Sequence, residues 1–230
     1  MSNWKEIWGG RAVAVQATSL ADLIRADGFD TGAGKVDTQA WRNYAAELAR
    51  RLGIATGDSV FEVGCGSGAL LKVFHEASHP VGGIDYSQVL IEHAQRAMPG
   101  MSFRTAEANQ LAGAAQDFVI ANSVFSYFPD LDYARDVLER MLTMARKGVA
   151  LLDLPDIQCR AAAEDFRRSA LAPGEYETRY RGLDHCYFAR EWFAGLTATR
   201  GWRIEVSVQW LADYGNAPHR FNVILTRIVA

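Results

Sequence analysis

The chain has 230 residues, of which 49% are hydrophobic and 22% charged, and its formal net charge is −3. This length allows one sizeable core and is short for two, and the acidic balance gives no basic face for nucleic acid. Three widely spaced cysteines, Cys65, Cys159 and Cys186, match neither a disulfide framework nor a metal-ligand pattern. We therefore expect no metal and a reducing, cytoplasmic location. No apolar run approaches the ~20 residues of a membrane span and the N-terminus has no signal-peptide pattern, so we expect no membrane association.

The N-terminal part of the chain carries two helical signals. Trp4, Ile7 and Trp8 are spaced so that they can share one helix face. Apolar side chains then recur at intervals of three and four over residues 38–52, which predicts a longer helix. We expect residues 1–55 to form an N-terminal helical cap or lid.

From residue 57 onward, short strands alternate with helices. Strands are predicted within 58–64, 80–87, 101–107, 116–125 and 147–154, and helices over 68–77, 88–98 and 131–145. The strands are nearly continuous apolar runs, which is typical of strands covered on both faces. The pattern therefore predicts a parallel sheet with crossover helices, an α/β architecture.

The alternation of strand and helix stops after Leu154. Residues 155–188 are rich in aromatic and arginine side chains, and a helix is predicted over 189–200. Two alternating strands, 202–211 and 220–229, suit an antiparallel pair. We therefore expect residues 56–230 to form one domain that carries an insertion at 155–188.

A glycine-rich turn marks the candidate ligand site. Gly64, Gly66 and Gly68 lie where the first strand meets its helix, so the turn is tight and a ligand can approach the backbone. Asp85 ends the next strand, where an acidic residue can reach a ribose diol. The pattern predicts a nucleoside-containing cofactor at the carboxyl ends of the first two strands.

A dinucleotide is one candidate for this cofactor. Gly64, Gly66 and Ala69 satisfy the relaxed fingerprint G-x-G-x-x-G/A. Glu62 disfavours it, because a carboxylate there repels a pyrophosphate and suits a cationic group. Glu107 follows the third strand, where it can accept a hydrogen bond from an adenine amino group. The chain also ends in a hairpin, where a dinucleotide-binding fold would have a second mononucleotide-binding half. An NAD-dependent oxidoreductase is therefore disfavoured.

Five segments share one family pattern: "VFEVGCGSG" at 60–68, "GGIDYS" at 82–87, "FRTAEA" at 103–108, "QDFVIANSVFSYFPD" at 116–130 and "KGVALLDL" at 147–154. With them the chain resembles the class I S-adenosylmethionine-dependent methyltransferases of the small-molecule type. The resemblance implies a Rossmann-like seven-stranded sheet of order 3-2-1-4-5-7-6, with strand 7 antiparallel, helices on both faces and an N-terminal helical cap. It also implies S-adenosylmethionine as cofactor and S-adenosylhomocysteine (SAH) as product.

The resemblance assigns cofactor roles residue by residue. The glycine turn approaches the methionine part of the cofactor, and Glu62 lies behind that turn. Asp85 takes the ribose hydroxyls, Glu107 and the backbone of Ala108 take adenine, and Asn122 lies beside the cofactor. The complete predicted cofactor set is Glu62, Gly64, Cys65, Gly66, Gly68, Asp85, Tyr86, Glu107, Ala108 and Asn122. Within the set, Cys65 is interpreted as an inert member of the turn.

Acceptor contacts are expected from 123–130, 173–188 and 213–220, the segments that vary between such enzymes. Their aromatic rings suit a cationic donor or acceptor, and their arginines suit a carboxylate or a phosphate. The predicted substrate-binding residues, which include one at the end of the fifth strand, are Asp153, Tyr176, Arg179, Tyr180, Tyr214 and Asn216. The candidate catalytic residues are His185, Tyr127 and His219, of which the two histidines are candidate bases; Tyr127 lies near where many members of the family have a histidine.

The predicted activity is in-line transfer of a methyl group to an oxygen or nitrogen of a small polar metabolite. A base is needed only when the acceptor carries a proton. An acceptor sulfur, a peptide or protein side chain, and a non-catalytic cofactor-binding partner protein stay open as alternatives. We expect a monomer or homodimer, with residues 155–188 and the first ~35 residues closing as a lid over a small acceptor.

Overall fold

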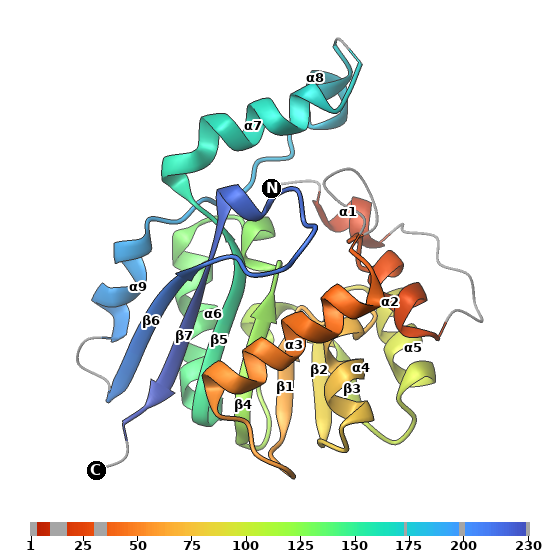
Figure 1. Cartoon of the computed structure of the whole chain (residues 1–230), viewed down its shortest axis with the longest axis vertical. Helices are drawn as coiled ribbons and strands as arrows, with labels where there is room; N and C mark the ends of the chain where they lie inside the picture. The colour runs from red at the N-terminus through yellow and green to blue at the C-terminus, as the bar shows by residue number, and fades with distance from the viewer. Residues whose placement is uncertain (1–3, 10–17, 30–35, 173, 198–200, 229–230) are drawn as a thin grey trace.

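The structure is a computed structural model that describes residues 4–9, 18–29, 36–172, 174–197 and 201–228. Its strands are β1 (Val60–Val63), β2 (Val81–Asp85), β3 (Ser102–Thr105), β4 (Gln116–Asn122), β5 (Ala145–Pro155), β6 (Trp202–Val208) and β7 (Arg220–Arg227). They form one sheet in the order β3-β2-β1-β4-β5-β7-β6 (Figure 1). β1 to β5 pair in parallel, and β7 pairs antiparallel with both β5 and β6. The predicted order, with its antiparallel strand 7, is confirmed.

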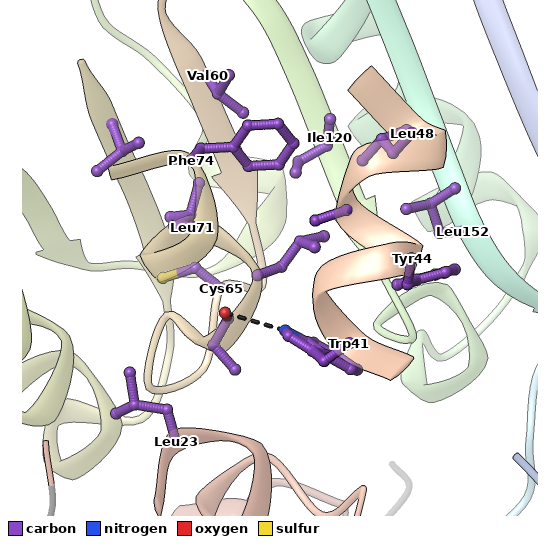
Figure 2. Close-up of a cluster of buried hydrophobic side chains, with 14 of the residues drawn as sticks. Leu23, Trp41, Tyr44, Leu48, Val60, Cys65, Leu71, Phe74, Ile120 and Leu152 are labelled. Carbon is purple, nitrogen blue, oxygen red and sulfur yellow. Dashed lines mark hydrogen bonds between the residues drawn. The ribbon is translucent and has the colours of Figure 1, made fainter. Parts of the chain in front are cut away.

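Three helices cover one face of the sheet: α3 (Thr38–Leu52), α4 (Ala69–Glu76) and α5 (Gln88–Ala97). Asp37 caps α3 by accepting from the Ala40 N–H, as expected of an aspartate at a helix start. Figure 2 shows Trp41, Tyr44 and Leu48 of α3 directed toward the side chains of the central strands. The Trp41 indole N–H donates to the Ala69 carbonyl at 3.0 Å, which fixes α3 against the start of α4.

The opposite face is covered by α6 (Leu131–Met144) and α9 (Arg190–Thr197). Asp130 caps α6 through the Tyr133 N–H, as the sequence predicts. Both faces of the strands are apolar because alternate residues serve the two cores: Leu152 of β5 lies in the α3 core and Leu151 in the α6 core. Such burial explains the continuous apolar strands of the sequence.

Four short helices lie near the carboxyl ends of the parallel strands: α1 (Trp4–Gly9), α2 (Leu20–Ala26), α7 (Arg160–Ser169) and α8 (Glu175–Arg179). In Figure 1, α7 and α8 are at the top, α1 lies below them, and α2 lies lower, beside the start of α3. α7 and α8 belong to the insertion, residues 155–188, which leaves the sheet after β5. Phe188 returns to it by a bridge to Asp156. Among the helices that the structure describes, none is long and apolar enough to span a bilayer.

Three element details differ from expectation. In α1, Trp4 is buried but Ile7 is 46% exposed, so the apolar face does not include all three predicted positions. β6 ends at Val208, earlier than predicted, because the Gln209 side-chain oxygen accepts from the N–H groups of Trp210 and Leu211 and turns the chain. α3 falls inside the predicted cap range 1–55, yet it packs on the sheet as part of the main core.

Candidate functional site

The glycine turn between β1 and α4 is fixed by close neighbours on two sides. Gly64, Gly66 and Gly68 all have positive φ, at 70°, 53° and 83°. A Cβ on Gly64 would lie 2.4 Å from a methyl group of Val124, and one on Gly66 would lie 2.4 Å from the Asp27 carboxylate. The turn therefore needs glycine both for its conformation and for the space.

Asp85 ends β2 beside this turn. One carboxylate oxygen accepts from the Gly66 N–H at 2.9 Å and the other from the Ser87 N–H at 2.8 Å. Burial raises the pKa of Asp85 above its ordinary value, against these two hydrogen bonds. The carboxylate is thus oriented by backbone at the edge of the sheet, where the sequence predicts a ribose.

Two further carboxylates, those of Glu62 and Asp27, approach the same turn. Glu62 is buried, and its Oε2 atom has no hydrogen-bond partner among the described residues. Burial raises the pKa of Glu62 well above its ordinary range, and the charges of Asp27 and Asp85 add to that shift. A buried, unpaired carboxylate is costly, and a cation bound nearby would remove most of that cost.

These three carboxylates line a cavity that we call the acidic pocket. Its lining is Trp8, Asp27, Phe29, Trp41, Glu62, Gly64, Cys65, Gly66, Leu70, Asp85, Tyr86, Leu90, Asn122, Ser123, Val124 and Tyr127. Among the described residues, this lining contains no lysine, arginine or histidine. The three carboxylates suit a ligand with positive charge and do not suit a pyrophosphate. S-adenosylmethionine, with its sulfonium and ammonium groups, fits these residues.

Asp27 is a residue that sequence reasoning missed. It lies just after α2, where its Oδ1 accepts from the Ser67 N–H at 2.7 Å and its Oδ2 from the Ala69 N–H at 3.3 Å. Burial raises the pKa of this carboxyl group to about 7, against the hydrogen bonds from Ser67 and Ala69. The sequence around Asp27 offers several acids in a glycine-rich loop, and no local pattern distinguishes this one.

A second cavity, which we call the apolar slot, adjoins the acidic pocket. It is lined by Trp4, Gly64, Asp85, Tyr86, Ala106, Glu107, Ala108, Val124, Tyr127, Phe128, Pro129 and Tyr133. Glu107 and Ala108, predicted to bind adenine, therefore lie together in a largely apolar site. Asn122 lines the acidic pocket, where its side-chain oxygen accepts from the Tyr44 hydroxyl at 3.0 Å.

A third cavity of about 360 Å³, which we call the outer chamber, lies between the N-terminal helices, the insertion and the β6–β7 connection. It is lined by Trp4, Trp8, Asp27, Gly28, Phe29, Ser123, Tyr127, Phe166, Arg167, Ala170, Leu171, Arg179, Tyr180, His185, Tyr214, Asn216 and Arg220. Tyr127 lines all three cavities, so they meet at its ring. The Trp4 indole closes the chamber by donating to the Asp184 carbonyl at 2.9 Å and by packing 4.8 Å from the ring of His185.

Six predicted acceptor or catalytic residues meet in the outer chamber: Tyr127, Arg179, Tyr180, His185, Tyr214 and Asn216. Three others are not part of its described lining. Asp153 is buried beneath it, at a φ of 60°, and accepts from the hydroxyls of Ser123 at 2.7 Å and Tyr214 at 3.0 Å. Tyr176 packs on Tyr180, with ring centroids 4.7 Å apart, and His219 packs on Phe166.

Two of the three candidate catalytic groups have strongly shifted pKa values. Burial, with the positive charges of Arg220 and Arg167, lowers the pKa of His185 to about 3. Burial raises the pKa of Tyr127 to about 12. The pKa of His219 is also lowered, chiefly by burial. At neutral pH these side chains are therefore uncharged, and His185 is a weak base.

Two members of the predicted cofactor set, Cys65 and Gly68, pack against neighbouring parts of the fold. The Cys65 sulfur packs against Gly83 of β2, and burial raises the pKa of its thiol well above the ordinary range. An unreactive cysteine is the result. Gly68 is the N-cap of α4 and packs against Met98 of the α5 end, outside the described lining of the three cavities.

Sequence reasoning also missed Trp4, Trp8, Arg167 and Arg220 as site residues. Trp4 and Trp8 were recognised as a helix face, but their partners lie in distant segments. Arg167 stands in the charged run from Arg160, which reads as a solvated helix surface. Arg220 begins β7, where its side chain is buried and donates to the Asp153 carbonyl at 3.2 Å.

The sheet order and the acidic pocket at the ends of β1 and β2 define the class I methyltransferase architecture. A family model described as "Methyltransferase domain" matches residues 36–206. The chain therefore belongs to this methyltransferase-domain family, and the predicted class of S-adenosylmethionine-dependent methyltransferases is confirmed.

Curated relatives are similar over part of their lengths. The chain is 26% identical over 185 residues to CymA, a probable non-canonical nonribosomal peptide synthetase of Salinispora arenicola, covering 73% of this chain and 2% of CymA. It is 28% identical over 116 residues to trans-aconitate 2-methyltransferase of Escherichia coli O157:H7, covering 49% of this chain and 45% of that enzyme. The chain thus spans less than half of either relative.

Solved structures share the fold. The magnesium protoporphyrin IX methyltransferase ChlM of Synechocystis PCC 6803 with bound SAH has a TM-score of 0.62 at 19% identity, covering 98% of this chain and 92% of ChlM. The plantazolicin methyltransferase BpumL in complex with SAH has a TM-score of 0.65 at 16% identity, covering 99% of this chain and 97% of BpumL. Identities this low establish the common fold and no more.

Proposed function

We propose that this chain transfers a methyl group from S-adenosylmethionine to an oxygen or nitrogen of a small polar molecule held in the outer chamber. The observation that carries the proposal is the ring of Tyr127, which lines the acidic pocket, the apolar slot and the outer chamber together. A donor in the first two cavities and an acceptor in the third would meet at this ring. In-line transfer requires such a meeting, because alignment supplies much of the rate, up to ~7–11 kcal/mol in well-oriented cases.

The donor assignment follows the charges and shapes of two cavities. In the proposal, Asp85 receives the ribose hydroxyls, the apolar slot with Glu107 and Ala108 receives adenine, and the glycine turn faces the methionine part. Glu62 and Asp27 then compensate the positive charge at that end. The structures of ChlM and BpumL, both of which hold SAH, support this cofactor.

The acceptor assignment rests on which segments form the wall of the outer chamber. α1 and the insertion meet through the hydrogen bond from Trp4 to the Asp184 carbonyl, so segments distant in sequence close one space. We propose that they act as a lid and that Tyr180, Tyr214 and Asn216 contact the acceptor. A closed lid excludes water from the reacting groups.

A peptide-bound acceptor is the second candidate, because the relative CymA is a peptide synthetase and BpumL is a plantazolicin methyltransferase. Such an acceptor would have to enter the outer chamber by one residue, since Trp4 and the insertion form part of its wall.

Labelled methyl transfer tests the proposal. The chain is incubated with S-adenosylmethionine carrying a tritiated methyl group and a low-molecular-mass cell extract, and the labelled product is identified by mass. We expect label in a small molecule and none with the Asp85→Ala variant. Label found only in protein would favour the second candidate. Limited proteolysis with and without SAH tests the lid, since equal cleavage of residues 155–188 in both states would contradict closure.

A further inference from the structure

The outer chamber contains four charged side chains, and three of them are already engaged. Asp27 accepts from two N–H groups of the glycine turn. Arg220 donates to the Asp153 carbonyl and lies 3.8 Å from the Asp153 carboxylate. Arg179 pairs with Glu175 at 2.5 Å. Only the fourth, Arg167, meets no carboxylate among the residues that the structure describes.

Arg167 is placed to receive an anion. It lies on α7, where one terminal N–H donates to the Tyr187 hydroxyl at 2.9 Å and the guanidinium lies 5.9 Å from the ring centre of Tyr180. Its Nε–H is buried and has no hydrogen-bond partner in the described part of the chain. A buried donor that is left unpaired costs about 1–3 kcal/mol, and more for a charged group. A carboxylate in the chamber would satisfy it.

Among the residues that its described lining contains, the chamber also offers no effective base for removing a proton from an acceptor. His185 has a pKa of about 3, and the phenol of Tyr127 has a pKa of about 12. Asp27 has a pKa of about 7, but both of its oxygens accept from the glycine turn. A cationic donor beside Asp27 would lower that pKa and weaken it further as a base. The acceptor that suits this chamber carries its reactive lone pair without needing deprotonation.

From these observations we propose that the acceptor is a small carboxylic acid, that its carboxylate oxygen takes the methyl group, and that Arg167 binds and orients this carboxylate. The inference rests on the proposed function and names its acceptor class. A guanidinium that meets no carboxylate among the described residues matches one singly charged carboxylate, which its remaining planar N–H groups can bind as a pair.

The reaction balances without any proton transfer. A lone pair of the carboxylate oxygen forms the new oxygen–carbon bond, and the carbon–sulfur bond breaks with its electron pair going to sulfur. An anion and a cation become a neutral methyl ester and a neutral thioether. A water-poor chamber favours this loss of charge, because separated charges are poorly stabilised there.

Arg167 then acts mainly on acceptor binding. The negative charge of the carboxylate decreases toward the transition state, so its attraction to the guanidinium is strongest before the reaction. An interaction of that kind lowers KM and does not raise kcat. Replacing Arg167 should therefore change the two constants very differently.

The first test is the alkali stability of the labelled product from the methyl-transfer assay described above. Methyl esters release tritiated methanol in mild alkali, whereas methyl ethers, N-methyl groups and methyl phosphates retain their label. We expect the label to become volatile. Label that survives alkali would overturn the carboxylate assignment and leave the proposed function standing. Absence of any labelled small molecule would instead contradict the proposed function, and this inference with it.

The second test separates Arg167 from its neighbour Arg168, which pairs with Asp165 and Glu177 outside the described lining of the chamber. With the acid identified in the first test, Arg167→Met should raise KM about 10- to 100-fold while kcat changes less than about threefold. Arg168→Met should leave both constants within about twofold, and Arg167→Lys should restore part of the affinity. Titration calorimetry of the acid against the SAH complex should show the same loss of affinity for Arg167→Met. An unchanged KM and affinity in a folded Arg167→Met protein would overturn the role of Arg167.

Discussion

The acidic pocket and the outer chamber share Tyr127, Trp8, Asp27, Phe29 and Ser123, yet their charges are opposite. The acidic pocket has three carboxylates and, among its described lining, no basic side chain. The outer chamber has three arginines and one carboxylate, and that carboxylate is bonded to the glycine turn. A positively charged donor and a negatively charged acceptor would each find the complementary half. The comparison teaches that the two ligands are selected by separate sets of residues, which mutations can separate.

The largest expected effect is the loss of donor binding in Asp85→Ala. This carboxylate is held by the Gly66 and Ser87 N–H groups, and in the proposal it accepts two ribose hydroxyls. Removing two hydrogen bonds to a charged group should weaken SAH binding at least ~100-fold, measured by calorimetry. Asp132→Asn, at an exposed carboxylate on α6, is the control and should bind SAH normally. A full SAH-induced thermal shift in Asp85→Ala would place the ribose elsewhere.

The acidic pocket was largely predictable from the sequence because its parts are close in the chain. β1, the glycine turn and β2 follow one another within residues 60–85, and parallel pairing brings Glu62 and Asp85 to one edge. Strand and helix periodicity alone therefore places the glycines, Glu62 and Asp85 together. The sheet order, in contrast, was implied only by the family resemblance, and the structure confirms it.

The outer chamber was predictable only as a set of segments. Its contacts join distant parts of the chain, such as the Trp4 indole and the Asp184 carbonyl, and no local pattern encodes such a pair. Arg167 lies on an amphipathic helix whose charges resemble an ordinary solvated surface. Asp153 was expected at the acceptor and instead lies beneath Tyr214, because a residue at a strand end can face either the cavity or the core.

A second, smaller effect should follow from Trp4→Ala, which removes part of the wall between the apolar slot and the outer chamber. Trp4 lines both the apolar slot and the outer chamber and joins α1 to the insertion. Losing this buried aromatic contact, worth about 2 kcal/mol, should lower kcat/KM about 30-fold and speed proteolysis of the insertion. Ile7→Ala removes an exposed side chain of the same helix and serves as the control. Unchanged cleavage of the insertion in Trp4→Ala would show that α1 does not hold it.

The pH dependence of donor binding should sharpen the comparison further. Because the pKa of Asp27 is raised to about 7, the donor-free protein has extra stability at low pH that is lost as the pH rises through 7. Donor binding has the opposite sign, since a cation favours the ionised carboxylate. The affinity for S-adenosylmethionine should rise about tenfold from pH 6 to pH 8, and the affinity for SAH, which lacks the sulfonium charge, should rise less.

The control for this pH effect is Asp27→Asn, which should flatten the rise in affinity. Some slope should persist, because the pKa values of Glu62 and Asp85 are raised as well. Calorimetric affinities at several pH values provide the measurement for both proteins. An equal slope in the wild type and in Asp27→Asn would remove Asp27 from the donor site.

The smallest effect is expected at Cys65, although this residue lies within the glycine turn itself. Its sulfur packs against Gly83 of β2, and burial raises the pKa of the thiol. Cys65→Ala should therefore leave SAH affinity and kcat within about twofold and lower the free energy of unfolding by about 1 kcal/mol through a small void. Iodoacetamide should label Cys65 far more slowly in the folded chain than in urea. A tenfold fall in kcat in Cys65→Ala would show instead that the thiol contacts the reacting groups. The acidic pocket would then contribute a nucleophile in addition to its three carboxylates.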